Sequence, residues 1–292
     1  MHGIIISLCD LTGVMVMPWV RAGYRAILVD PQHKDGANDY LVCECGHDFP
    51  AALGHYGCPN CEGEHQALPG LVTKVGHELD HPTSWRIVRE AISSGTVAFV
   101  AGFPVCTQLA VSGTSRWAEK RTKDANFQVR ALELVHECRI IGQLSGAPWF
   151  FENPVSAISS MYRKPDHTFH PYEYGEYLPA GDEHPLYPEY FPPQDAYGKK
   201  TCLWTGGGFV MPQKRPVPLE SSQTDGQGQS KAHNKLGGKS DKTKNIRSAT
   251  PRGFAQAVFE ANAPHLRVSA DLDHAIRSVG DMGDLFGEVA AA

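Results

Sequence analysis

Short apolar runs alternate with helical patterns along most of this chain, and this alternation constrains its fold more than any other feature. Apolar runs that end at a polar residue or a glycine predict strands at 3–9, 25–30, 71–75, 96–101 and 148–151. Helical periodicity lies between or after them, around Pro18 and at 82–93, 123–145 and 252–263. Strands joined by helices build a parallel sheet that is covered on both faces. The sequence therefore predicts an α/β protein with an open, Rossmann-like sheet.

The length and composition suit one domain of this class. The chain has 292 residues, 41% of them hydrophobic, enough to bury the core of a medium-sized α/β domain with an insertion. No stretch approaches the roughly 18 consecutive apolar residues of a membrane span. The N-terminus also lacks a cationic signal-peptide start. We therefore expect a soluble cytoplasmic protein without membrane contact.

The charges are distributed unevenly. The chain has 27 Lys and Arg and 32 Asp and Glu, a net charge of −5. Residues 199–252 hold 11 of the basic and 3 of the acidic side chains, which leaves 16 and 29 for the rest. Because nucleic-acid affinity comes mainly from Lys and Arg, this local excess permits a nucleic-acid partner that the net charge would disfavour. The alternative is a solvated basic loop.

Four of the eight cysteines have the spacing of a zinc site. They form two close pairs in the stretch 41–66: Cys43, Cys45, Cys58 and Cys61. Paired cysteines on tight turns present thiolates to a tetrahedral Zn²⁺, and this stretch predicts a small zinc-ribbon-like insertion with a structural metal. The first pair is one residue shorter than usual, which leaves His47 or His55 open as a substitute ligand. Disulfides are the alternative, which the lack of an export signal disfavours.

Small and polar residues follow the first two predicted strands. They are Asp10, Leu11, Thr12 and Gly13 after the first strand, and Asp30 after the second. Ligands of open α/β sheets bind at the carboxyl ends of strands, where a small turn admits a nucleotide and an acid bonds ribose hydroxyls. The chain has no G-x-G-x-x-G motif, so a turn used purely for folding is the alternative.

Two further strand ends carry groups suited to catalysis. Cys106 lies on the loop after the 96–101 strand, where a thiol can act as a nucleophile if positive charge lowers its pKa. Glu152 and Asn153 follow the 148–151 strand. Glu152 either caps a helix or faces the same crevice as Cys106. Together these strand ends predict a functional site at one edge of the sheet.

In the combination of these strand-end motifs, the chain resembles the cytosine-C5 DNA methyltransferase family, particularly its short phage- and prophage-type members. The resemblance rests on residues 8–13 and 29–30 for the cofactor motifs, Pro104-Val105-Cys106 for the nucleophile motif, and Glu152-Asn153-Pro154 for the Glu-Asn-Val motif. It implies a Rossmann-like S-adenosylmethionine-dependent catalytic domain over 1–292, interrupted by the zinc segment. It also implies S-adenosylmethionine as methyl donor, with Pro104 joining the turn residues and Asp30 at the cofactor, and cytosine in the DNA of a bacterial or phage-infected cell as acceptor.

The resemblance extends to target recognition. Tyr174-Gly175 and residues 199–204 look like the family's Tyr-Gly and basic strand motifs, which implies a small target-recognition region at 163–246 with a mobile basic loop at 220–246. Lys199 and Lys200 stand where the family has arginines, and Val105 stands where it has the proline before the nucleophile. The side chains expected to contact nucleic acid are Arg116, Arg121, Lys199 and Lys200, the first two on a loop at 112–123.

The implied chemistry is covalent. Cys106 would attack C6 of a flipped-out cytosine as a thiolate, which activates C5 toward the methyl group. Glu152 would hydrogen-bond or protonate N3, and Asn153 would fix the Glu152 carboxylate. Two alternatives stay open. One is a related C5 modification of a pyrimidine nucleotide or RNA, and the other is a catalytically inactive, zinc-containing DNA-binding module.

Overall fold

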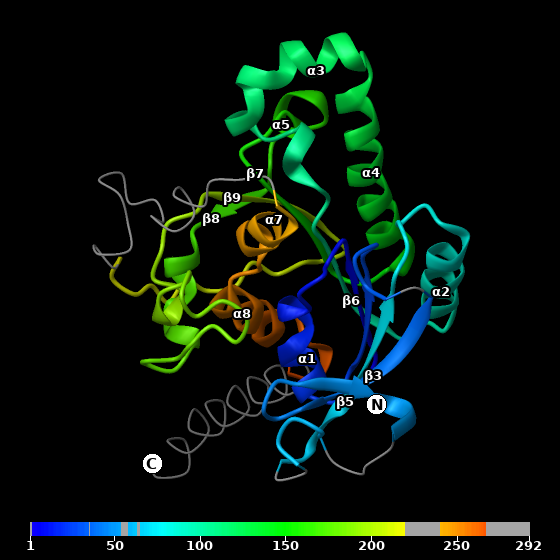
Figure 1. Ribbon diagram of the computed structural model, residues 1–292, viewed down its shortest axis with the longest axis vertical. Helices are drawn as coiled ribbons and strands as arrows, with labels where there is room; N and C mark the ends of the chain where they lie inside the picture. The colour runs from blue at the N-terminus through cyan, green and yellow to red at the C-terminus, as the bar shows by residue number, and fades with distance from the viewer. Residues whose placement is uncertain (1, 35, 54–57, 63–64, 220–239, 267–292) are drawn as a thin grey trace, which may run out of the picture.

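A single mixed sheet lies at the centre of the computed structural model, which describes residues 2–34, 36–53, 58–62, 65–219 and 240–266. Within these ranges nine strands pair in the order β4-β3-β5-β2-β1-β6-β7-β9-β8 (Figure 1). The strands are β1 Ile4–Leu8, β2 Arg25–Val29, β3 Ala37–Cys43, β4 Asp48–Pro50, β5 Ala67–Val75, β6 Val97–Gly102, β7 Trp149–Pro154, β8 His167–Phe169 and β9 Thr201–Gly206.

The five central strands are parallel, and the chain changes direction across the sheet between β1 and β6. From β1 it adds β2 and then β5 on one side, and it continues with β6 and β7 on the other. The antiparallel strands β3 and β9 border this parallel core. In open α/β sheets, ligands bind beyond the carboxyl ends of the strands at such a reversal. The topology therefore directs attention to the loops after β1 and β6.

Burial on both faces explains why the central strands are apolar throughout. Ile5 and Ile6 of β1 are both fully buried, yet they belong to different core clusters. Leu28 and Val29 of β2 divide between the two clusters in the same way. Successive side chains of a strand point to opposite faces, so continuous apolar character marks strands that are covered on both sides.

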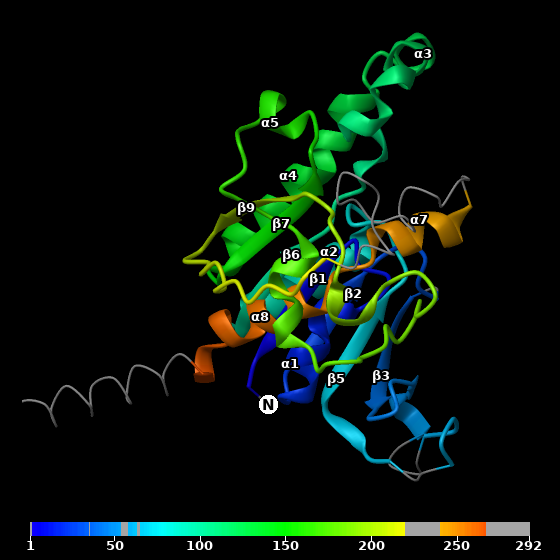
Figure 2. The ribbon, with the colours of Figure 1, turned by 90° about the vertical axis from the view of Figure 1, so that its left-hand side faces the viewer.

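Helices form a layer on each face of the sheet (Figures 1 and 2). On one face Trp19 and Phe254 join the core, and on the other Val88 and Ile141 do. The helices that carry them are α1 Met17–Arg21, α8 Arg252–Asn262, α2 Pro82–Ser93 and α4 Phe127–Ser145. The other α-helices are α3 Trp117–Lys123, α5 Ile158–Met161 and α7 Asp241–Ser248. No helix in the described ranges is long and apolar enough to cross a membrane.

Most of the elements predicted from periodicity are confirmed. β1, β2 and β6 coincide closely with the predicted runs, and 71–75 forms the second half of β5. α2 spans 82–93 as predicted, with His81 as its N-cap, and α8 follows the predicted 252–263 pattern. The strands β3, β4 and β8 were not predicted, and β9 was implied only by the resemblance of residues 199–204 to the family's basic strand motif.

Three predicted boundaries are wrong. The expected loop at 112–123 is a 3₁₀ turn, Val111–Arg116, followed by α3. The long helix expected from 123 begins at Phe127, because the extended backbone of Asp124 separates it from α3. The strand expected to end at 151 continues to Pro154, because β9 pairs with it along that length.

The expected mobile loop at 220–246 is only partly within the described residues. Residues 220–239 lie outside them. The remainder is ordered into α7, whose N-cap, Ser240, accepts a hydrogen bond from the backbone N–H of Thr243 at 3.3 Å. A side-chain cap of this kind satisfies one of the free N–H groups at a helix start. The end of the expected loop is therefore helical.

Candidate active site

The carboxyl ends of β1, β6 and β7 bring the predicted site motifs to one edge of the sheet. The residue after β6, Phe103, donates its backbone N–H to the carbonyl of Leu8 at 2.9 Å. The turn after β1 and the loop that carries Cys106 therefore lie side by side at the reversal of strand order. Glu152 comes directly after Phe151, the last β7 residue paired with β6. The structure thus gathers the three motifs as predicted.

Hydrogen bonds to the Asp10 side chain stabilise the turn after β1. The buried Asp10 carboxylate accepts from the Ser7 hydroxyl at 2.8 Å, the Gly13 N–H at 2.8 Å and the Thr12 hydroxyl at 3.2 Å. Gly13 has a left-handed backbone (φ 66), and a Cβ there would lie 3.1 Å from Leu28 Cδ1. Asp10 therefore shapes the turn, and glycine is the residue type that its conformation favours.

A second acid, Asp30, follows β2 at the same edge. The Asp30 carboxylate accepts a hydrogen bond from the Gln32 N–H at 2.9 Å, and the backbone N–H of Asp30 donates to the Val75 carbonyl at 3.1 Å. Burial raises the pKa of Asp30, and the nearby charge of Asp10 acts in the same direction. His33 links the two turns, with Nε2 3.1 Å from the Asp10 carbonyl oxygen. Asp30 is placed where the sequence predicts an acceptor for ribose hydroxyls.

Cys106 opens a 3₁₀ turn, Cys106–Gln108, beyond the end of β6. The residue is half-buried, whereas Val105 before it is 55% exposed. Burial raises the pKa of Cys106 and the charge of Glu152 raises it further, while Lys199 and Arg247 act to lower it. The thiol therefore lies within electrostatic range of both a carboxyl group and cationic side chains.

Asn153 fixes the nucleophile loop. Its buried Nδ2 donates to the Pro104 carbonyl at 2.9 Å, two residues before Cys106. The prediction that Asn153 holds the Glu152 carboxylate is wrong, because successive residues of a strand point to opposite sides. Asn153 and Pro104 therefore act on the position of Cys106. The alternative of Glu152 as a helix cap is wrong too, since Glu152 lies within β7.

Buried oxygens without partners lie beside this loop. Within the described ranges, Glu152 Oε2, Asn153 Oδ1 and Ser156 Oγ are covered from solvent and have no hydrogen-bond partner. Burial raises the pKa of Glu152, which the positive charge of Lys199 opposes. Native proteins leave few buried polar atoms unpaired, and those that remain call for an explanation. The Ser156 hydroxyl was not among the predicted site residues.

Lys199 and Lys200 have different surroundings, although both were predicted to contact nucleic acid. The Lys199 ammonium donates to the Arg247 carbonyl in the last turn of α7 at 3.0 Å, and its charge acts on Cys106 and Glu152. Lys200 is exposed, and its charge instead acts on His170 and Cys202. The involvement of α7 was not foreseen, since no local pattern links it to Lys199.

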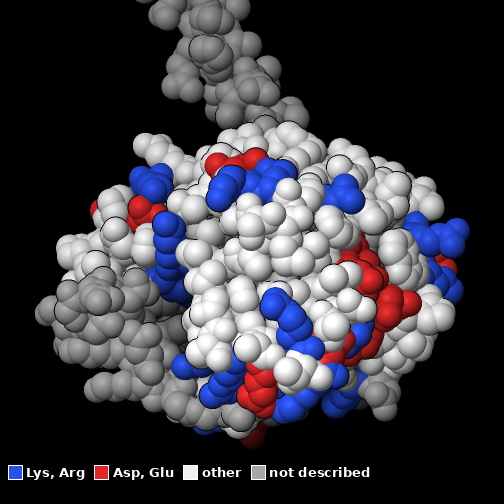
Figure 3. Space-filling view, turned by 90° about the horizontal axis from the view of Figure 1, so that it is seen from above, with Lys and Arg blue, Asp and Glu red and all other residues white. Residues whose placement is uncertain are grey.

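Arg116 and Arg121 are exposed on the segment beyond the Cys106 loop and are not brought to the Cys106 cluster. Between them, Lys120 ties α3 to that loop, because its ammonium donates to the Thr107 carbonyl at 3.0 Å and to Gln108 Oε1 at 2.7 Å. Viewed from above this edge, Lys and Arg side chains are interspersed with Asp and Glu (Figure 3). The visible face is therefore not uniformly basic.

The four predicted metal ligands come together elsewhere. The Sγ atoms of Cys43, Cys45, Cys58 and Cys61 all lie within 4.8 Å of one another, an arrangement compatible with zinc. Cys43 pairs with Ala67 at the start of β5, whereas Val75 at its end lies beside Asp30. The cluster is therefore at the opposite edge of the sheet from Cys106 (Figure 1). His47 is not part of it, and His55 is outside the described residues.

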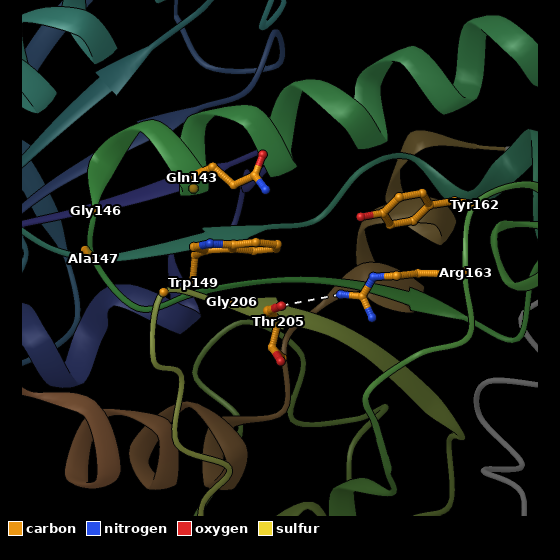
Figure 4. Close-up of a pocket in the computed structure, with 10 residues that line it drawn as sticks. Gln143, Gly146, Ala147, Trp149, Tyr162, Arg163, Thr205 and Gly206 are labelled. Atoms are coloured by element: carbon orange, nitrogen blue, oxygen red, sulfur yellow. Dashed lines mark hydrogen bonds between the residues drawn. The ribbon is translucent and has the colours of Figure 1, made fainter.

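A cavity of about 330 Å³ is also separate from the Cys106 edge. It lies at the start of β7, where Trp149, Tyr162 and Arg163 line it (Figure 4). Arg163 donates to the Thr205 carbonyl at 3.4 Å and also pairs with Asp166. Since Glu152 lies toward the other end of the same strand, this cavity is not part of the candidate active site.

Comparisons with known proteins add little to this geometry. No family model and no curated protein matches the chain. Among solved structures, one match is a prophage-encoded E. coli protein proposed to be a DNA modification methyltransferase, with 12% identity and a TM-score of 0.36. The match covers 74% of this chain and 52% of that one, so the chain spans about half the length of that structure. A likeness of this degree establishes neither activity nor partner.

Proposed function

We propose that the chain transfers a methyl group from S-adenosylmethionine to C5 of a cytosine in DNA, through a covalent adduct with Cys106. The observation that carries the proposal is the buried, unpartnered oxygen Glu152 Oε2, whose carboxyl group acts electrostatically on the half-buried Cys106 thiol beyond the carboxyl ends of β6 and β7. A buried polar atom without a partner costs roughly 1–3 kcal/mol. We infer that a ligand with hydrogen-bond donors completes this site.

A cytosine edge matches the Glu152 carboxyl group. Burial raises the pKa of Glu152, which favours the protonated form. A protonated carboxyl donates to the unprotonated N3 of cytosine, and its second oxygen accepts from the exocyclic amine. Uracil and thymine carry an N–H at N3 and a carbonyl at C4. The donor and the acceptor are therefore exchanged at both positions that Glu152 would contact. Glu152 would therefore select cytosine and stabilise the charge that develops on its ring.

Cys106 supplies the nucleophile. Its thiolate would form a bond to C6 and the electrons of the C5–C6 double bond would move to C5, which would take the methyl group as the methyl–sulfonium bond of the donor breaks and S-adenosylhomocysteine leaves. A base removes the C5 proton, and cleavage of the S–C6 bond restores the aromatic ring and the thiolate. Neutralisation of Glu152 removes one cause of the raised pKa of Cys106, and Lys199 continues to favour the thiolate. A protonated Glu152 and a Cys106 thiolate, the two states that the reaction needs, are thus mutually compatible.

The turns after β1 and β2 would hold the methyl donor. S-adenosylmethionine supplies a methyl group on a sulfonium centre when it is bound. Asp10 keeps the first turn tight, and Asp30 offers a carboxylate to ribose hydroxyls at the next strand end. This donor set fits a nucleoside, and the turn lies beside the Cys106 loop, as a transfer between neighbouring sites requires.

DNA as the acceptor rests on the family resemblance and on the basic side chains near this edge. Because C6 is inaccessible within a stacked duplex, the target base must leave the helix, at a cost of about a few kcal/mol. Phosphate contacts from Arg116, Arg121 and Lys200, all exposed, would offset part of this cost.

Replacement of the thiol tests the proposal. We expect Cys106→Ala to abolish transfer of labelled methyl groups from S-adenosylmethionine to DNA, and to abolish covalent trapping by 5-fluorocytosine DNA. The matched control is Cys202→Ala, which removes a buried thiol on β9 and leaves the proposed nucleophile in place. Undiminished transfer in Cys106→Ala, or label recovered in a nucleoside other than 5-methylcytosine, would contradict the assignment.

A further inference from the structure

The four-cysteine cluster takes no part in the proposed methyl transfer, and its local structure resembles a metal-binding knuckle. Gly46 has a left-handed backbone (φ 86) and donates its N–H to the Cys43 carbonyl at 2.8 Å, which closes a turn over residues 43–46 that contains both of the first two cysteines. On the second turn, the Asn60 N–H lies 3.4 Å from the Cys58 sulfur. Each pair of cysteines therefore lies on a turn that is closed by a backbone N–H.

The spacing of the sulfurs fits a single ion between them. Cys43 Sγ and Cys61 Sγ are 3.6 Å apart, and Cys45 Sγ and Cys58 Sγ are 3.7 Å apart. Sulfurs bound tetrahedrally to zinc at about 2.3 Å are separated by about 3.8 Å. A disulfide needs about 2.05 Å between its sulfurs. These two distances match edges of such a tetrahedron and exceed any S–S bond, and the other sulfur pairs of the cluster lie within 4.8 Å.

The ligand set is complete without an outside group. Among the described residues, the ligand atoms that all lie within 4.8 Å of one another are these four thiols, and the His65 side chain hydrogen-bonds Cys61 from outside that set. Four protein ligands leave no open position for water or substrate, which distinguishes structural zinc sites from catalytic ones. A site of this composition therefore serves folding.

The surrounding lobe has too little core to hold these turns unaided. Among its described residues, the buried apolar cluster consists of Phe49, Cys43 and Cys58, with Leu41, Cys61 and Ala67 partly buried against them. Small units of this kind usually depend on a metal or disulfides, because burial of so few side chains does not offset the cost of ordering the chain. Metal binding then supplies the folding free energy of the lobe.

We propose that the cysteines bind one structural Zn²⁺, which fastens the β3–β4 hairpin to the start of β5. β3 runs antiparallel to β5 from Ala37, opposite Val75, to Cys43, opposite Ala67. The nine residues of β5 span roughly 26 Å at about 3.3 Å per residue. The ion therefore acts at one end of this strand pair, while Asp30 lies at the other. Loss of metal would release the lobe without removing any proposed catalytic group.

Metal analysis of the purified full-length protein tests the proposal. We expect close to one zinc per chain, and its loss in the double variant Cys58→Ser/Cys61→Ser. Cys138→Ser, which changes a buried cysteine outside the cluster, is the matched control and should retain the metal. Stoichiometric iron, or no stoichiometric metal in a folded wild-type protein, would overturn the assignment.

A second measurement keeps the test valid if the double variant does not fold. A mercurial reagent added stepwise to the wild-type protein should release zinc, seen with a coloured chelator, as about four thiols per site react. Hydrogen exchange should then accelerate in β3 and β4, while β1 and β6 keep their protection. Unchanged exchange in β3 after complete metal loss would contradict the fastening role. Neither readout depends on methyl transfer, so each proposal can fail without the other.

Discussion

At the scale of single residues, the site depends on how neighbours in sequence diverge in space. Glu152 and Asn153 adjoin in β7, yet Asn153 holds the Pro104 carbonyl while Glu152 acts on Cys106. Lys199 and Lys200 diverge in the same way before β9. In β7 the extended backbone sends consecutive side chains to opposite sides, and the charges of Lys199 and Lys200 act on different groups, so one residue of each pair acts on the Cys106 thiol.

The contrast between the two lysines gives a pH prediction. Lys199 favours the charged form of Cys106, so Lys199→Gln should raise the pKa of Cys106. Because the thiolate is the reactive form, alkylation of Cys106 by iodoacetamide should then become slower at each pH below the new midpoint, and its rise should move to higher pH. Mass spectrometry of the Cys106 peptide across a pH series measures this.

Lys200→Gln serves as the matched control for that experiment. It removes the same charge one residue away, and its profile should follow the wild type, since Lys200 acts on His170 and Cys202. Equal shifts in the two variants would show that only general charge matters. The absence of a shift in Lys199→Gln would remove Lys199 from the surroundings of the nucleophile.

At the scale of elements, close packing sets the positions of α4 and β7, which carries Glu152. Gly142 of α4 lies against the Trp149 indole, and Gly206 of β9 lies on the same ring (Figure 4). A Cβ at Gly142 would be 2.5 Å from Trp149 Cγ. At Gly142 the helix backbone therefore lies so close to the Trp149 ring that a side chain at this position would overlap with the ring.

This contact predicts a reversal of the usual helix propensity. In an exposed helix interior, Gly→Ala stabilises by about 1 kcal/mol. Here we expect Gly142→Ala to lower the free energy of unfolding by about 1–3 kcal/mol, because the new methyl group overpacks against Trp149. Urea denaturation measures this, with the exposed Gln143→Ala as a near-neutral control. A stabilised Gly142→Ala would show that the ring has room to move.

At the scale of the whole molecule, the proposed catalytic site and the cysteine cluster lie at opposite edges of the sheet. α7 lies at the carboxyl edge, where Asn245 bonds Gln32 and the Arg247 carbonyl accepts from Lys199. The cysteine cluster lies at the other edge. Lys231, Lys235 and Lys239 are outside the described residues, so the structure locates only the end of that stretch.

The basic stretch therefore gives a prediction about DNA affinity. Lys242 and Lys244 are exposed on α7, the helix whose last turn accepts a hydrogen bond from Lys199, and each phosphate contact contributes about 0.9 to the slope of log K against log salt. Lys242→Gln/Lys244→Gln should weaken DNA binding and reduce that slope by about 1–2, as measured by fluorescence anisotropy over a salt series. Arg86→Gln/Arg89→Gln, on the exposed side of α2, is the control. Equal effects of the two double variants would place DNA elsewhere.

The parts of the fold and site that could be predicted are those with a local signal. The apolar run at 96–101 showed a strand buried on both faces, and Cys106 followed it at the expected edge. The residue pattern did not predict β9, which only the family resemblance implied, and the pairing of β9 extends β7 to include Glu152 and Asn153. The roles of Ser156, Lys199 and α7 were missed as well, because they depend on contacts between segments far apart in the chain.

The sequence by itself determined the central parallel strands, the polar residues at their ends and the four cysteines with metal-ligand spacing. Hydrophobic period and short-range spacing are properties of neighbouring residues, so they can be recognised before the chain folds. Only the tertiary structure decided that Asn153 holds the Cys106 loop, that Lys199 accompanies Glu152, and that the cysteines lie at the far edge. The physical reason is strand pairing: the register of β3 on β5 and of β9 on β7 is set by packing across the whole sheet, and that register assigns each side chain its partner.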